Sequence, residues 1–111
     1  MANDTILKEG MILSGTRGYS MIIPCFYKVT KVTPTGCKVV ELDKYVTRSA
    51  DGGYNQQCYE KPKTIGVRRG AKEQMARSWG DGEWKIGSSR NYTATYVRIW
   101  DGQEVYADYC D

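Results

Sequence analysis

The chain has 111 residues and a formal net charge of +3, from 16 basic and 13 acidic side chains, and it contains no histidine. That length allows one domain, residues 1–111, with one hydrophobic core. The lack of imidazole excludes Ser-His-Asp and Cys-His nucleophiles and His-ligated zinc, and so small a positive charge does not by itself indicate nucleic-acid binding. Nine Tyr, three Trp and twelve Gly favour an all-β domain, because large rings suit pleated surfaces and glycines supply turns.

The first part of the chain predicts a flexible polar lead-in over residues 1–9 and no secretory signal, since no basic stretch precedes a long apolar run. The run Met21-Ile22-Ile23 stops at Pro24, so no membrane span is expected. We therefore expect a cytoplasmic protein whose thiols stay reduced. The four cysteines contain no C-x-x-C pair, which predicts buried, inert thiols and neither a metal site nor a cofactor. They are Cys25, Cys37, Cys58 and Cys110.

In chain order, composition and turn signals predict five to seven strands, drawn from residues 10–15, 25–32, 37–42, 58–61, 64–69, 83–86, 92–100 and 103–109. The sequence Thr33-Pro34-Thr35-Gly36 predicts a hairpin between the second and third segments, with a bulge and a positive φ at Gly36. Residues 43–49 extend or bend the third segment. Pro62 predicts a sheet edge or a break.

Residues 71–79 are the one segment that predicts a helix, of two turns at most, with an irregular loop as the alternative. Near the end of the chain, Asp101-Gly102 is a pair favoured in tight two-residue turns, so 92–100 and 103–109 are predicted to pair as a hairpin. Trp100 is expected in the core. The sequence does not determine which face of this hairpin is buried. The fold class is therefore all-β, with at most one short helix: a small antiparallel, SH3-like or related β-barrel, because closure hides strand edges.

Several short motifs, in this order, resemble those of a family of small uncharacterised proteins of phages, plasmids and gut bacteria. Members begin with Gly-Asp-Ile and then show Trp-Gly-Tyr and Phe-Tyr-Gln-Val. They close with a Tyr-rich strand and Leu-Trp-Asp-Gly before a last Tyr-containing strand. The matching pieces here are Gly10-Met11-Ile12, Arg17-Gly18-Tyr19, Phe26-Tyr27-Lys28-Val29, Lys85-Ile86, Ser88-Ser89, Tyr92, Tyr96, Ile99-Trp100-Asp101-Gly102 and Val105-Tyr106. Arg17 replaces the family's Trp, and Cys25 replaces an acidic residue. The resemblance implies a mobile-element protein that acts in the host cytoplasm by blocking host machinery.

The basic stretch from residue 61 to residue 77 is the main candidate binding feature, with six positive charges and one negative charge, Glu73. Tyr59 and Trp79 flank it, and aromatic rings beside basic groups suit protein interfaces and nucleic acids alike. A loop around residues 17–19 and the end of the chain offer further contacts. The candidate partner-binding residues are Arg17, Tyr19, Lys61, Lys63, Arg68, Arg69, Lys72, Arg77, Trp79 and Tyr109. Ordinary solvated surface is the alternative for each of them.

Two functions remain open. The first is a phage-type binding protein that inhibits a host defence protein, such as a CRISPR-type nuclease. The second is a nucleic-acid-binding small barrel that contacts phosphates through residues 61–77. Catalysis is not expected, because the acid pairs Asp81/Glu83 and Asp101/Glu104 lack a third ligand and a general base, and the oligomeric state stays open.

Overall fold

A computed structural model of the chain describes residues 7–17, 22–49, 57–67, 70–80, 82–86 and 95–108; within these ranges, only the backbone is described at residues 17, 64–66 and 79. The described residues form eight strands, all paired antiparallel, and no helix, which confirms the expected small antiparallel β-barrel. The strands are β1 (Ile12–Arg17), β2 (Ile23–Thr33), β3 (Gly36–Ser49), β4 (Gln57–Val67), β5 (Gln74–Gly80), β6 (Glu83–Ile86), β7 (Thr95–Ile99) and β8 (Val105–Asp108).

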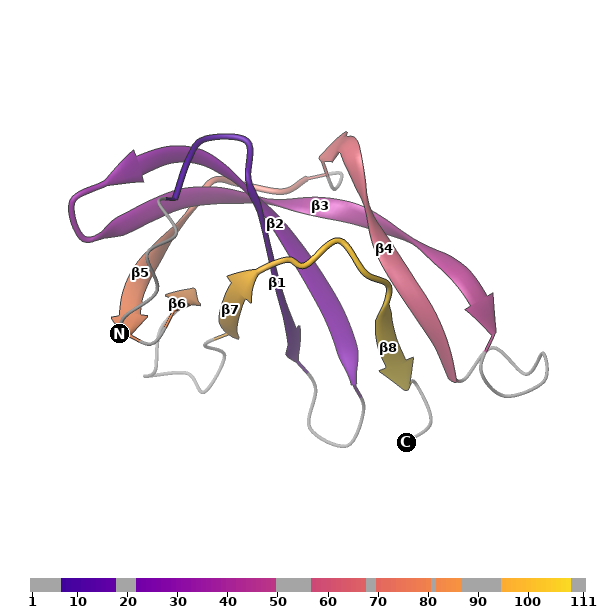
Figure 1. Cartoon of the computed structure of the whole chain (residues 1–111). Coiled ribbons are helices and arrows are strands. Elements are labelled where there is room, and N and C mark those ends of the chain that lie inside the picture. Colours follow the sequence, from indigo (N-terminus) through magenta and orange to yellow (C-terminus); the bar gives the residue numbers. More distant parts are fainter. Residues whose placement is uncertain are drawn as a thin grey trace.

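Six of these strands close into a barrel (Figure 1). Around it the order is β2, β1, β7, β6, β5 and β3, and the pairing of β3 with β2 completes the circle. The other two strands, β4 and β8, continue from β3 outside the barrel. We call the arrangement of β3 residues 42–49 with β4 and β8 the extension sheet.

The long strand β3 belongs to both parts of the molecule. Its residues 36–39 pair with β5, and its pairing with β2 ends at Glu41 opposite Tyr27. From Leu42 onward its described pairing is with β4 instead. Residues 43–49 therefore extend the predicted third strand out of the barrel.

Strand β2 separates two buried clusters, because its side chains alternate between its faces. Cys25, Tyr27 and Val29 point into the barrel. There they join Leu13, Cys37, Val39, Ala76, Ile86 and Val97. Pro24 and Phe26 are also buried but lie on the opposite face of β2, which the extension sheet covers. The buried residues Leu42, Cys58 and Ala107 belong to the extension sheet and lie outside the barrel cluster.

The predicted hairpin between β2 and β3 is confirmed, with two differences. Thr33 pairs with Gly36, so the turn takes only Pro34 and Thr35, and the bulge lies further along, at Thr30. Gly36 does not take a positive φ. Glycine is needed there because a Cβ would overlap the backbone oxygen of Ala76, where β3 and β5 approach closely.

The predicted helix over residues 71–79 does not form. Residues 71–73 are irregular, as the alternative expected, but residues 74–80 form β5, so the loop prediction is wrong from Gln74 onward. This strand pairs with β3 on one side and with β6 on the other, and Ala76 is fully buried in the barrel. A two-turn helix is marginal on its own, so the hydrogen bonds and burial gained by closing the barrel outweigh its propensity.

The expected edge at Pro62 is confirmed: β8 pairs with β4 only as far as Glu60, and Pro62 lies beyond that stretch.

The predicted C-terminal hairpin is also wrong. Strand β7 pairs with β1 and β6, so both of its edges are occupied, and β8 pairs with β4. The local turn does form: Gln103 N donates to Asp101 Oδ1 at 2.9 Å, and Gly102 has φ of +86°. This turn carries the chain from the barrel to the extension sheet. On β7, Thr95 and Val97 are buried and Tyr96 is exposed, which settles the face that the sequence left open.

Candidate functional site

Strand β4 presents alternate side chains to opposite faces of the extension sheet. Cys58, Glu60 and Pro62 are buried on the face toward β2, and Tyr59, Lys61 and Lys63 lie on the other face. Pairing across the sheet brings more residues to that second face: Tyr45 lies opposite Lys61, Arg48 opposite Tyr59, and Tyr106 opposite Tyr59 on the other side. We call this set the outer face: Tyr45, Arg48, Tyr59, Lys61, Lys63 and Tyr106.

The aromatic and cationic groups of the outer face contact one another directly. The Arg48 guanidinium carbon lies 4.1 Å from the centroid of the Tyr59 ring, a cation–π contact. The rings of Tyr59 and Tyr106 meet edge to face, with centroids 5.6 Å apart and an interplanar angle of 66°. Three strands therefore hold these side chains in a fixed arrangement before any ligand arrives.

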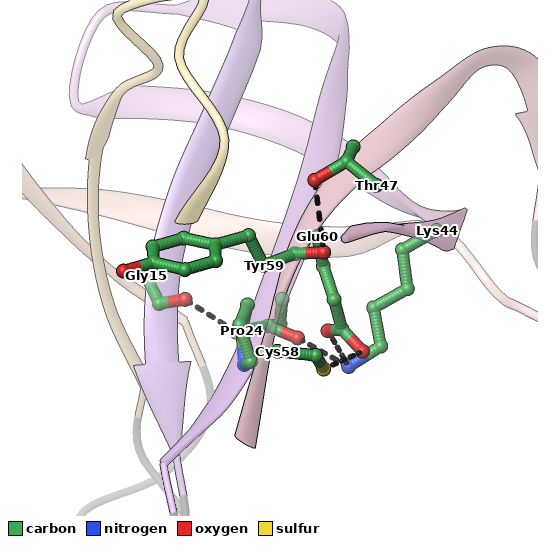
Figure 2. Close-up of polar contacts among 8 residues, drawn as sticks. Gly15, Pro24, Lys44, Thr47, Cys58, Tyr59 and Glu60 are labelled. Atoms are coloured by element: carbon green, nitrogen blue, oxygen red, sulfur yellow. Dashed lines mark hydrogen bonds and ion pairs between the residues drawn. The ribbon is translucent and has the colours of Figure 1, made fainter. Parts of the chain in front are cut away.

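A carboxylate on the segment before β8 fixes Arg48 further. Arg48 Nε donates to Glu104 Oε1 at 2.6 Å. The Thr47 hydroxyl donates to Glu104 Oε2. It also lies 3.1 Å from the backbone oxygen of Tyr59 (Figure 2). The hydrogen bonds from Thr47 and then Arg48 lower the pKa of Glu104, and the same contact raises the pKa of Arg48. Glu104 thus offsets the charge of Arg48, and the positive charge of the outer face comes mainly from Lys61 and Lys63.

Beneath the outer face, an ion pair joins the extension sheet to the barrel. Lys44 Nζ lies 2.9 Å from Glu60 Oε1 and donates to the backbone oxygen of Pro24 at 2.8 Å (Figure 2). Glu60 is only 4% exposed, and the Cys58 thiol lies 3.9 Å from its second oxygen. Since Pro24 belongs to β2, this lysine connects three strands and sets how the extension sheet lies over the barrel.

The structure divides the basic stretch 61–77. Lys61 and Lys63 lie on the outer face, Lys72 is exposed between β4 and β5, and Arg77 is exposed on the outside of the barrel. Among the residues that the structure describes, the cations of this stretch therefore lie on more than one surface. The cause is β3, which pairs with β4 along one half and with β5 along the other.

The remaining candidate residues are less fully described. Arg17 is the last residue of β1, opposite Ile23, and Trp79 lies in β5, but their side chains are outside the described part of the structure. Tyr19, Arg68, Arg69 and Tyr109 lie outside the described residues altogether.

Sequence reasoning missed Tyr45 and Arg48 as members of a site, and it placed Tyr106 on a hairpin that does not exist. The alternation of buried and exposed residues along 57–63 could have grouped Tyr59 with Lys61 and Lys63. It could not have identified the neighbouring strands. Those follow from β3 leaving the barrel and from β8 pairing with β4.

The described thiols lie in the interior. Cys25, Cys37 and Cys58 are buried, as expected, and Cys110 lies outside the described residues. Burial raises the pKa of Cys37 to about 11, so that thiol stays protonated at neutral pH. Within the described ranges, no three His, Cys, Asp or Glu side chains are grouped as metal ligands would be.

No family model, curated protein or solved structure matches the chain. No helix long and apolar enough to cross a membrane occurs in the part of the chain that the structure describes.

Proposed function

We propose that this protein is a binding module whose outer face docks onto an acidic surface of a partner protein. The observation that carries the proposal is the contact series from Arg48 to Tyr59 to Tyr106, with Lys61 and Lys63 beside it. Tyr and Arg are the residues that most often dominate binding energy at interfaces. Because intramolecular contacts already order them, little side-chain entropy is lost on docking.

The chemistry of the outer face also indicates what kind of surface the partner presents. Lysines at the rim favour encounter with a negatively charged surface, and the half-buried tyrosines supply apolar contact at the centre. The resemblance of the sequence to phage and plasmid proteins is the reason to seek this partner in the host cytoplasm. A host defence protein, such as a CRISPR-type nuclease, is the candidate that it suggests.

Two observations favour a protein partner over nucleic acid at this face. Of the cations of the 61–77 stretch that the structure describes, Lys61 and Lys63 lie on β4 in the extension sheet and Arg77 lies on β5 in the barrel, so they do not form one row along a single strand. One face of the Tyr59 ring is covered by Arg48, which leaves less of it for a base to stack on.

Affinity capture from host lysate, with nuclease present, tests the proposal. The tagged protein should retain one host protein, and the double variant Lys61→Glu/Lys63→Glu should lose it. The matched control is Lys31→Glu/Lys72→Glu, which makes the same change of charge at exposed positions outside the outer face and should retain the partner. Capture that disappears on nuclease treatment, or that both double variants lose equally, would contradict docking through the outer face.

A further inference from the structure

The carboxylate of Glu104 bridges two hydrogen-bond donors at the edge of the outer face. Its Oε1 accepts from Arg48 Nε at 2.6 Å, and its Oε2 accepts from the Thr47 hydroxyl. The hydrogen bonds from Thr47 and Arg48, and after them the charges of Arg48 and Lys61, lower the pKa of Glu104. We call the two donors, Arg48 Nε and the Thr47 hydroxyl, the carboxylate site; in the structure Glu104 fills it.

Both donors of the carboxylate site have a second contact that does not involve Glu104. The Arg48 guanidinium lies over the Tyr59 ring, 4.1 Å from its centroid. The Thr47 hydroxyl lies 3.1 Å from the backbone oxygen of Tyr59, which is an alternative acceptor. When Glu104 moves away, neither donor is left without an interaction, so the site stays formed.

Glu104 can leave the carboxylate site at small cost. It lies on the connection between β7 and β8, and other hydrogen bonds hold the turn there: Gln103 N donates to Asp101 Oδ1, and Trp100 Nε1 donates to the backbone oxygen of Gln103. The ion pair is open to solvent, with 60% of the Arg48 side chain and 26% of the Glu104 side chain accessible. Ion pairs exposed in this way contribute little net stability.

An acidic partner meets a carboxylate that is already in place. A partner aspartate or glutamate that approaches Arg48 while Glu104 remains is repelled, because like charges brought together at an interface cost affinity. Among the outer-face residues, Arg48 alone carries a guanidinium, whose fork of N–H donors matches the two oxygens of a carboxylate. Lys61 and Lys63 attract an acidic surface but do not orient its carboxylates in this way.

We infer that docking exchanges the carboxylate of Glu104 for that of an aspartate or glutamate of the partner, which then binds Arg48 and Thr47. The inference rests on the proposed docking of the outer face, and it names the group that the partner presents there. Glu104 acts as a competitor within the same chain. The partner binds only those molecules from which Glu104 has moved away, so the apparent affinity is reduced in proportion to their fraction.

Fluorescence anisotropy with a labelled oligoglutamate peptide tests the inference. Glu104→Gln removes the competing charge and should tighten peptide binding about fivefold or more, the factor expected when the site is free in about one molecule in five. Thermal melts show that each variant is folded.

The matched control is Glu83→Gln. Glu83 Oε2 lies 2.9 Å from Arg98 Nη2 on the barrel, and 29% of the Glu83 side chain is accessible. The control therefore makes the same change of charge at a similar ion pair outside the outer face. It should tighten peptide binding by less than about twofold, because salt screens a distant charge.

A second comparison shows whether Glu104 acts through Arg48. In the Arg48→Gln background, Glu104→Gln should tighten peptide binding no more than Glu83→Gln does, because no guanidinium remains to be released. The same gain from Glu104→Gln with and without Arg48 would overturn the exchange.

The variant Lys61→Glu/Lys63→Glu separates this inference from the proposed function. If that variant loses the peptide while Glu104→Gln and Glu83→Gln tighten binding equally, the outer face binds acidic chains and only the exchange is wrong. If neither the unmodified protein nor Glu104→Gln binds the peptide, the exchange is also wrong, and capture from host lysate still decides the proposed function by itself.

Discussion

The ring of Trp100 packs edge-on against the ring of Phe26, with centroids 6.0 Å apart and an interplanar angle of 76°. Phe26 lies on the face of β2 that points away from the barrel interior, so this contact holds the start of the β7–β8 connection against that face. Trp100 Nε1 also donates to the backbone oxygen of Gln103 at 2.7 Å. One side chain thereby directs the chain from the barrel toward the extension sheet.

Trp100→Phe should cost about 1 kcal/mol of unfolding free energy, because it keeps an aromatic ring and loses the hydrogen bond to Gln103. Trp100→Ala should cost about 2–3 kcal/mol, less than a fully buried tryptophan, since Trp100 is half-buried. Urea unfolding followed by circular dichroism measures both. Equal losses for the two variants would mean that the ring contact with Phe26 contributes nothing.

Lys44→Met should destabilise the protein by about 3 kcal/mol, because it leaves the carboxylate of Glu60 buried without its cation. The double variant Lys44→Met/Glu60→Leu should recover most of that loss, since no buried charge remains. Urea unfolding of the single and double variants completes the comparison. If the loss of unfolding free energy in the double variant equals the sum of the losses in the two single variants, Lys44 and Glu60 do not stabilise each other and this explanation fails.

Gly36→Ala should destabilise the barrel by about 1–3 kcal/mol or more, because its Cβ would meet the backbone oxygen of Ala76, which a rotamer change cannot move. Thr35→Ala, at the exposed neighbouring position, is the control and should stay within about 0.5 kcal/mol of the unmodified protein. Thermal unfolding distinguishes them. A Gly36→Ala protein as stable as the control would show that β3 and β5 can separate without cost.

The contact between Arg48 and Glu104 should weaken in acid. The pKa of Glu104 is lowered in the folded protein by the hydrogen bonds from Thr47 and Arg48, so its carboxylate adds stability above its ordinary pKa of 4.5. That contribution is lost as the pH falls through the lowered folded value. The difference in unfolding free energy between the unmodified protein and Glu104→Gln, measured from about pH 7 to about pH 3, should therefore shrink toward the acid end. A constant difference would exclude ionisation of Glu104 as its source.

Local signals predicted the elements that depend on neighbours in the sequence. The β2–β3 hairpin, β6 and the central part of β7 follow from β-branched and aromatic residues bounded by turn residues, and closure into a barrel follows from the need to cover strand edges. The predictions that fail are those that long-range pairing decides. The segment that forms β5 has helix-forming residues, and only its two partner strands make it extended. Asp101-Gly102 predicts a turn correctly but does not determine which strand the chain joins next.

The candidate site shows the same division. Lys61 and Lys63 were predicted as binding residues from charge alone, and they lie together on the outer face. Arg77 was grouped with them because it is near in sequence, yet it lies on the barrel. Tyr45 and Arg48 reach the site through the extension of β3, and no local pattern in the sequence distinguishes that extension from an ordinary strand end.

The continuity of β3 has a consequence for how the two parts of the molecule respond to each other. One continuous strand extends from Gly36 in the barrel to Ser49 at the far end of the extension sheet, so an opening of β3 as a unit breaks hydrogen bonds in both parts of the molecule. A molecule clamped over Tyr45 should therefore slow amide exchange at Val39, although it makes no contact with that residue. Slower amide exchange in the barrel would then show that the outer face is occupied, although the outer face belongs to the extension sheet.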